Sequence, residues 1–414
     1  TAAARAAEDT MTDGSNLPDG AAIKAYGDTN WAGGGASDID GLSDAVTTAT
    51  SNIGLGSTAI DSITTGDYNV GLGDNAGTAI TEGDDNTIMG YNAGAAITTS
   101  SKNVIIGFEA MKEFSSASHN GSSVAIGYKA MSLGSNDNVS GNTVIGCEAF
   151  VDSGSQQCNS NVVIGFHAGG YTTTATASRD NSVVIGVDAG ADWLGSGGVV
   201  LIGASAGKSL TTGNYNVCVG ETAGYGVTTG INNLLLGRQA GQPQSPVTVT
   251  TDDNNICLGN SLHDDFYCAD SSISTSDERD KTDIETFTHG LDFVNQMRPV
   301  TFRWDKRSWY CEESEDEEGN VISITDEDVA NAVPDGTHKR AEIRLGFIGQ
   351  EVQAIEQQYG YSQIKDDGTP DEDTELIVDT VNDGLKMGLQ YAKVVPILVN
   401  AIKELSAKVE VLEN

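Results

Sequence analysis

Ser276 and Lys281 lie five residues apart in the stretch ISTSDERDKTDI, and their types and spacing could do covalent chemistry. A serine hydroxyl becomes a useful nucleophile only when a base takes its proton. A free lysine has a pKa of about 10.4, so a lysine serves as that base only when burial or a neighbouring cation favours its neutral form. The alternative is structural, because TSDE also fits a helix capping box with Thr275 as the N-cap and Glu278 reaching back.

Other residue types that carry chemistry show no comparable pattern. The 5 histidines lie far apart without metal-ligand spacing, and the 6 cysteines include no C-x-x-C. The stretch GLGDNAG lacks the lysine and the helix of a phosphate-binding loop. The sequence therefore predicts no cofactor and no metal site. No pair of acids stands out for glycosidase work, but a depolymerase site formed between subunits would leave no linear motif, so that alternative stays open.

The net charge limits the partners of the chain. Its 22 Lys and Arg against 59 Asp and Glu give a formal charge of -37, which repels nucleic-acid phosphates and anionic membrane surfaces. The longest aliphatic run, VVPILV, is interrupted by Pro396, so no segment is expected to span a bilayer. We expect neither nucleic-acid binding nor membrane insertion.

A short phrase such as NVIIGFEAM recurs many times upstream of the Ser–Lys pair. Successive copies are 17 to 22 residues apart, and the insertions between them are rich in Ser, Thr, Asn and Gly. A short period of this kind predicts a stacked coil with variable loops. The phrase is anchored on these glycines: Gly73, Gly90, Gly107, Gly127, Gly146, Gly165, Gly186, Gly203, Gly220, Gly237 and Gly259.

Both faces of the strand inside the phrase are apolar. The residues one and three positions before the glycine share one face, and the residue between them points the other way. In the copy at Gly107 these residues are Ile106, Val104 and Ile105. A strand that is apolar on both faces must be buried on both, yet a lone β-roll buries only its inner face. The simplest cover for the outer face is the same chain in a homotrimer.

Two further positions of the phrase have structural interpretations. Asn stands four residues before the glycine in eight of the eleven copies, where it would adopt a left-handed turn or stack in a hydrogen-bonded ladder. Ala stands three residues after the glycine in ten copies, which suits a crowded corner. The phrase resembles the repeats of trimeric autotransporter adhesin heads, which form left-handed parallel β-rolls, and those of phage tail fibres.

The composition changes after Cys268, where glycine becomes rarer and four ordered blocks follow. They are SDERDKTDI, LDFVNQMRPVTFRW, RLGFIGQEVQAI and LQYAKVVPILVNAIKELSAKVEVLE. In this order they resemble the intramolecular chaperone domain that ends endosialidase-type tail spikes and many tail fibres. The opening motif of that family, S-D-x-R-x-K-x-x-I, is met by Ser276, Asp277, Arg279, Lys281 and Ile284.

The resemblance implies a module that trimerises the chain, guides the folding of the β-structure upstream and then cuts itself off. In that scheme Lys281 is the general base and Ser276 is the nucleophile that attacks the carbonyl of Thr275. The cleavage site is the bond between Thr275 and Ser276. In this scheme the module is a serine peptidase that acts once, on its own chain, and has no external substrate.

Three neighbours of the catalytic pair bear on this scheme. Asp277 and Arg279 belong to the motif, and the guanidinium of Arg279 is the neighbouring cation that would favour a neutral lysine. The family usually has an apolar residue where this chain has Asp280. A carboxylate at that position would stabilise the charged form of the lysine and so oppose catalysis.

The last helix has the pattern of a coiled coil. Apolar residues alternate at spacings of four and three, which predicts a seam of about two heptads, although a helix packed in the module core stays open. The residues of the seam are Leu398, Ile402, Leu405, Val409 and Leu412.

Two other segments of the module also have expected roles. The acidic insert at 312–336 is expected to be a solvated loop, with a cation site left open. Phe302 and Trp304 are expected to fill the module core.

The sequence thus predicts a mainly β fold: an elongated homotrimeric parallel β-roll or triple β-helix, followed by an α+β chaperone domain that ends in a coiled-coil helix. Residues 1–51 form an N-terminal linker or stalk remnant, 52–268 the repeat shaft, 269–275 a linker and 276–414 the chaperone domain, with its last helix at 389–413.

The predicted function is that of a bacteriophage tail fibre. Such a fibre would assemble in the host cytoplasm, join the virion tail baseplate through a region upstream of residue 1, and bind a glycan or protein receptor on the host cell surface. A trimeric adhesin or filament on a bacterial surface and a carbohydrate depolymerase tail spike are the alternatives.

Overall fold

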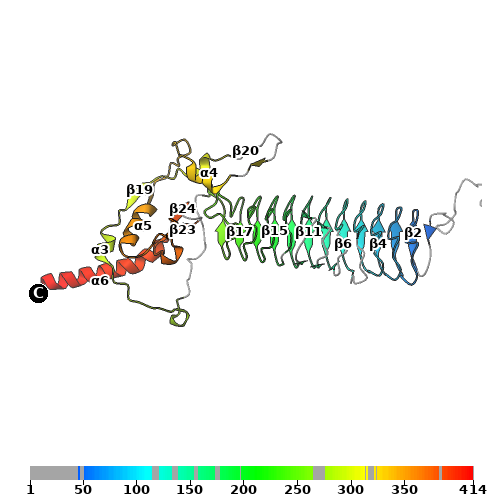
Figure 1. Ribbon diagram of the computed structural model, residues 1–414, viewed down its shortest axis with the longest axis horizontal. Helices are drawn as coiled ribbons and strands as arrows, with labels where there is room; N and C mark the ends of the chain where they lie inside the picture. Colours follow the sequence, from blue (N-terminus) through cyan, green and yellow to red (C-terminus); the bar gives the residue numbers. More distant parts are fainter. Residues whose placement is uncertain are drawn as a thin grey trace, which may run out of the picture. The chain divides into compact units, whose positions relative to one another are not determined.

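The computed structural model divides the chain into two compact units, residues 1–182 and 183–414, which are described in turn. Figure 1 labels elements of both units and colours them along the sequence. Coils of the repeat occur in both units, and the second unit also contains the C-terminal module. The residues that the structure describes are 45–46, 51–113, 121–132, 139–152, 157–172, 178–195, 197–263, 276–312, 314–315, 321–322, 324–381 and 385–413.

In the first unit each copy of the repeat contributes one short strand to a parallel sheet. Ile88 pairs with Ile105, 17 residues later, and Ile105 pairs with Ala125 across a longer insertion, so insertions leave the register intact. Each coil therefore pairs with the next coil of the same chain, which makes a parallel β-solenoid rather than strands intertwined among chains. The strands are β2 (Ile53–Leu55), β3 (Val70–Leu72), β4 (Thr87–Met89), β5 (Val104–Ile106), β6 (Val124–Ile126), β8 (Thr143–Ile145) and β11 (Val162–Ile164).

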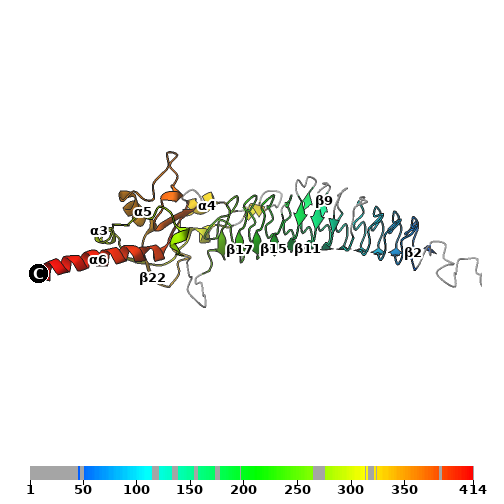
Figure 2. The ribbon, with the colours of Figure 1, turned by 90° about the horizontal axis from the view of Figure 1, so that it is seen from below.

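Additional short strands accompany this sheet. A two-residue strand, β1 (Ala45–Val46), pairs antiparallel with β2. Strand β2 belongs to an additional copy of the repeat, which precedes the copy anchored on Gly73. Two further parallel ladders form where the intervals between copies are longer, and Figure 2 shows β9 apart from the row of repeat strands. Their strands are β7 (Val139–Ser140), β10 (Cys158–Asn159) and β13 (Arg179–Asp180) in one ladder, and β9 (Val151–Asp152) and β12 (Tyr171–Thr172) in the other.

The inside of the coil is formed by the middle residue of each strand. Ile88, Ile105 and Val144 are fully buried, whereas the residues on either side of them remain partly exposed. Ala93 and the nine other alanines that stand three residues after an anchoring glycine are also fully buried, which confirms the crowded corner in ten of the eleven copies. Ile97 and its counterparts complete this core.

The repeated Asn residues form a buried ladder along the coil. The side-chain amide of Asn86 donates to the side-chain oxygen of Asn69 at 2.9 Å, and that of Asn103 donates to Asn86 at 3.0 Å. The ladder interpretation is confirmed, but the left-handed turn lies one residue earlier, at positions such as Asp85 (φ 58°). The Asn side chains stabilise the coil by satisfying buried polar groups.

The second unit continues the same construction in its own coils. Leu201 pairs with Cys218 and Cys218 with Leu235 in parallel register. The strands are β14 (Val183–Ile185), β15 (Val200–Ile202), β16 (Val217–Val219), β17 (Leu234–Leu236) and β18 (Ile256–Leu258). The interval from Gly237 to Gly259 is the longest of the repeat and contains Pro243 and Pro246.

The C-terminal module of the second unit is a small α+β structure. Its core contains Phe293, Val352, Ile355 and Ile397, and helix α3 packs against α6 in Figure 1. The elements are η2 (Glu278–Asp280), α3 (Leu291–Val294), β19 (Val300–Phe302), η3 (Arg307–Tyr310), β20 (Ser314–Glu315), β21 (Val321–Ile322), α4 (Asp326–Asn331), β22 (Arg344–Gly346), α5 (Gly349–Gln358), η4 (Glu372–Thr374), β23 (Val378–Val381), β24 (Lys386–Leu389), η5 (Tyr391–Lys393) and α6 (Val394–Glu413). The last helix thus begins at Val394, after a single 3₁₀ turn.

Two expectations about the module were wrong. Trp304 is 45% exposed and makes an edge contact with Phe302, so neither belongs to the buried core. The acidic insert is more than a solvated loop, because helix α4 forms within it. Thr325 and Asp328 close a capping box at the start of α4, and this cap defines where the helix begins.

Candidate functional site

The two predicted catalytic side chains lie within hydrogen-bonding distance. The Nζ of Lys281 donates to the Oγ of Ser276 at 2.7 Å. A lysine at this distance takes the hydroxyl proton once its own ammonium has lost one. Thr275, on the other side of the predicted cleavage site, lies outside the described residues.

A single 3₁₀ turn brings the pair together. The backbone N–H of Lys281 donates to the carbonyl of Glu278, and that of Asp280 donates to the carbonyl of Asp277, each at 3.2 Å. The cap of this turn is Asp277, whose side chain accepts from the backbone N–H of Arg279 at 2.9 Å. The observed N-cap of this turn is therefore Asp277, whereas Thr275, the N-cap of the capping-box alternative, lies outside the described residues. The turn places Lys281 back against Ser276.

Asp277 and Arg279 brace this turn with an ion pair. The guanidinium Nη2 of Arg279 lies 2.6 Å from Oδ2 of Asp277, and its Nε donates to Oδ1 at 3.0 Å. The Arg279 side chain, and then its backbone N–H, hold the pKa of Asp277 below its usual value, and Asp277 raises the pKa of Arg279. Because the guanidinium is paired with Asp277, it is not a free cation beside Lys281, and its role is to hold the turn.

Ser276, Lys281 and Asp280 are all exposed in the single chain, and Ile284 is 65% exposed. Within the described part of the chain Lys281 forms no ion pair with Asp280. Water around an ammonium favours its charged form, so the single chain has the geometry of a catalytic pair without the burial that a neutral lysine requires.

The coil strands expose an apolar surface that runs along each unit. We call it the strand face: the first and third residues of the repeat strands, which are apolar or Thr throughout the described strands. Met89 is 43% exposed and Ile145 is 36% exposed. Tyr91, Phe108 and Tyr128 form a stacked row beside it, with ring centroids 5.3 and 5.5 Å apart. An uncharged stripe on a chain of net charge -37 marks a surface suited to burial.

Helix α6 has one face in the module core and another in solvent. Val394, Ile397 and Ala401 are buried, whereas the predicted seam, including Ile402 (65%) and Leu405 (52%), is exposed. The seam is therefore free for another helix rather than packed in the core. At the N-terminal end of α6 an apolar hollow of about 390 Å³ is lined by residues that include Phe347, Tyr391 and Leu398.

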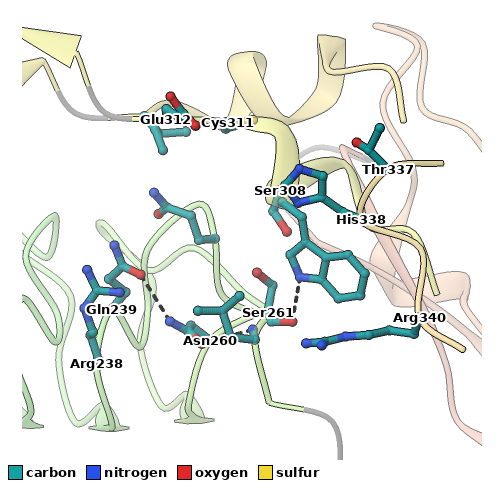
Figure 3. Close-up of a pocket in the computed structure, with 14 residues that line it drawn as sticks. Arg238, Gln239, Asn260, Ser261, Ser308, Cys311, Glu312, Thr337, His338 and Arg340 are labelled. Atoms are coloured by element: carbon teal, nitrogen blue, oxygen red, sulfur yellow. Dashed lines mark hydrogen bonds between the residues drawn. The ribbon is translucent and has the colours of Figure 1, made fainter. Parts of the chain in front are cut away.

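A polar cavity of about 650 Å³ lies beside the last coil, between Asn260 and the 3₁₀ turn η3 of the module (Figure 3). The indole N–H of Trp309 donates to the carbonyl of Ser261 at 2.9 Å, and the guanidinium of Arg340 lies over the indole ring (Figure 3). The cavity wall thus joins the last coil to the module.

The comparisons with known proteins concern the C-terminal module. A family model described as "chaperone of endosialidase" matches residues 276–361. No curated protein and no solved structure matches the chain. The family match and the β-solenoid fit a trimeric tail-fibre or tail-spike type of protein with a C-terminal chaperone domain. Among the described helices, none combines the length and apolar character needed to cross a membrane.

Sequence reasoning missed the residues that connect the last coil to the module, above all Thr248, Asp326 and Lys386. They lie in segments without periodicity, so no motif points to them. A signal was nonetheless present: the longest interval of the repeat contains Pro243 and Pro246, the only prolines of residues 52–268.

Proposed function

We propose that this chain is a homotrimeric bacteriophage tail fibre that attaches the virion to a glycan or protein on the host surface. The C-terminal module drives trimerisation and folding of the solenoid shaft and is then released by a cut between Thr275 and Ser276. The observation that carries this proposal is the 2.7 Å contact between Lys281 and Ser276 at the first residues of the matched chaperone family.

The trimer is supported by two exposed apolar surfaces on one chain. The strand face would be covered by the strand faces of two other copies. A solenoid with the same spacing of coils places one of its strands opposite each strand of this face. The α6 seam would close into a three-helix clasp, with Leu405 among the residues of its core. Covering both surfaces removes apolar area from water, which is the main driving force of association.

The cleavage step follows from the groups at the cut. Neutral Lys281 takes the hydroxyl proton of Ser276, and Oγ attacks the carbonyl carbon of Thr275. The peptide C–N bond then breaks as the Ser276 nitrogen accepts a proton from Lys281, which leaves an ester between Thr275 and the Ser276 oxygen. Water hydrolyses the ester, so residues 1–275 end in a carboxylate and residues 276–414 begin with a free amine.

Assembly would also time this cut. The catalytic pair is exposed in one chain, and desolvation by neighbouring copies would favour the neutral lysine that the reaction needs. Solenoid trimers depend on intermolecular contacts and fold slowly, so a temporary nucleus is useful. After its removal the fibre would persist because its barrier to unfolding is high.

Light scattering of the uncut Ser276→Ala chain, beside residues 1–275 expressed alone, tests the role of the module. The full chain of 43.0 kDa is expected to form a particle of three times that mass. Residues 1–275 alone are expected to aggregate or misfold. A folded, monomeric full chain, or an equally good yield of trimer without the module, would contradict the proposal.

A further inference from the structure

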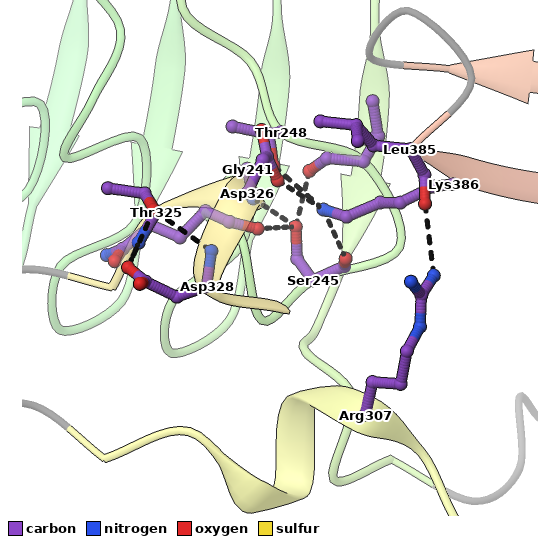
Figure 4. Close-up of polar contacts among 11 residues, drawn as sticks. Gly241, Ser245, Thr248, Arg307, Thr325, Asp326, Asp328, Leu385 and Lys386 are labelled. Atoms are coloured by element: carbon purple, nitrogen blue, oxygen red, sulfur yellow. Dashed lines mark hydrogen bonds and ion pairs between the residues drawn. The ribbon is translucent and has the colours of Figure 1, made fainter. Parts of the chain in front are cut away.

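Two insertions meet where the last coil contacts the module. One is the last-coil insertion, residues 242–250, which lies in the longest interval of the repeat. The other is the acidic insert, whose helix α4 begins at Asp326. The hydroxyl of Thr248 donates to Oδ1 of Asp326 at 2.7 Å, so the two insertions touch through polar side chains (Figure 4).

Lys386, the first residue of β24, completes this contact. Its Nζ lies 3.2 Å from Oδ1 of Asp326 and donates to the hydroxyl of Thr248 at 2.7 Å and to the carbonyl of Ser245 at 3.2 Å (Figure 4). The side chains of Lys386 and Asp326 are only 14% and 21% exposed. A charged amine this deeply covered is costly unless it keeps its partners, and two of these partners belong to the shaft.

The surrounding structure holds each partner in place. The Ser245 hydroxyl accepts from the N–H of Gly241 at 3.1 Å and donates to the carbonyl of Gln242 at 2.7 Å, which fixes the turn of the last-coil insertion. On the module side, Arg307 donates to the carbonyls of Ala330 and Leu385, each at 3.0 Å, and so ties α4 to β24.

A second contact on the same coil limits rotation of the module. The carbonyl of Ser261 accepts from Nζ of Lys306 and from the indole N–H of Trp309, each at 2.9 Å. Two separate polar anchors on the last coil specify one orientation of the module.

We propose that the last-coil insertion is a docking site for the module, and that Lys386, Asp326 and Thr248 hold the module on the shaft after the chain between them has been cut. Release then requires two events, the cut and the loss of this polar contact. The proposal does not depend on the cut being made by Ser276.

An engineered cut tests the contact independently of the Ser–Lys pair. Residues 269–274 of the Ser276→Ala chain are replaced by the recognition sequence of a site-specific protease, and the protein is cut after it has folded. Size-exclusion chromatography at successive times then measures how much of the module stays with the shaft. Lys386→Met and Thr248→Val are compared with Lys393→Met, which removes the same charge from an exposed position in the module.

The parent and the Lys393→Met control are expected to keep the module bound for the same time after cutting. Loss of one partner of a covered charge pair acts on dissociation, so Lys386→Met is expected to release the module at least about tenfold faster. Thr248→Val, on the shaft side, should act in the same direction. Immediate release from the parent, or equal retention in the parent and in both variants, would overturn the proposal.

Discussion

The anchoring glycine of the repeat permits a sharp test of the coil geometry. Gly127 has a φ of +138°, and a Cβ added to it would lie 2.2 Å from the carbonyl oxygen of Gly146 in the next coil. The obstacle is backbone, which cannot move without separating the two coils. Gly127→Ala therefore combines an unfavourable backbone conformation, worth about 1–3 kcal/mol, with a steric clash, and we expect a loss of at least about 3 kcal/mol.

A matched glycine in the same unit supplies the control. Gly141 has a φ of +68°, and the nearest atom to an added Cβ is the Ser160 oxygen at 3.7 Å. The equivalent position of a neighbouring coil holds Ser122 at φ 61°, so a side chain is tolerated there. Gly141→Ala is expected to cost only about 1 kcal/mol.

Thermal unfolding of both variants, followed by far-UV circular dichroism at one heating rate, measures the difference. For a unit of this size 1 kcal/mol corresponds to roughly 2–4 °C, so Gly127→Ala should unfold about 6–12 °C below the parent and Gly141→Ala about 2–4 °C below it. Equal unfolding temperatures for the two variants would refute the close approach of consecutive coils at the anchoring glycine.

Three further substitutions test other surfaces and groups. Ile126→Asp lies on the strand face, so one coil tolerates it while a trimer would have to bury three carboxylates; sedimentation velocity is expected to show folded monomers, and a stable trimer would count against this face. Leu405→Ser alters the exposed α6 seam and should weaken the trimer by roughly 2 kcal/mol per helix, measured by dissociation on dilution, whereas unchanged dissociation would remove α6 from the interface. Burial raises the pKa of the Cys218 thiol from 9.0 to about 12, so the unfolded chain loses this proton first and stability falls as pH rises above 9. Cys218→Val should lessen this loss by about 1.4 kcal/mol at about pH 10 in urea titrations, and parallel pH profiles for the two proteins would argue against a buried neutral thiol.

The coil was predictable because its signals are local and repeated. The short spacing and a mainly apolar triplet recur along the repeat, and an alanine follows in ten of the eleven copies, so the period and the strand could be predicted from sequence. Which face of the strand points into the coil could not be predicted, because Val104, Ile105 and Ile106 are all apolar. The choice is made by closure of the coil, where Ile105 packs inside with Ala110 while its two neighbours stay partly exposed.

The catalytic pair could be predicted from a local motif, whereas the docking contact between distant segments could not. Ser276 and Lys281 are joined by one turn, so a motif of a few residues contains the whole geometry. The docking contact joins Thr248 to Asp326 across 78 residues and to Lys386 across 138. Such distant pairs have no local pattern, because the fold of two separate segments decides whether they meet.

Intact mass spectrometry of the purified chain tests self-cleavage most directly. Wild type is compared with Ser276→Ala, Lys281→Ala and Lys281→Arg, which keeps the charge but has no proton-accepting form near neutral pH. We predict a fragment of residues 276–414 that begins at Ser276 in wild type and is absent from all three variants. A wild-type chain that stays uncut in a folded trimer would contradict self-cleavage and make the module a permanent trimerisation cap.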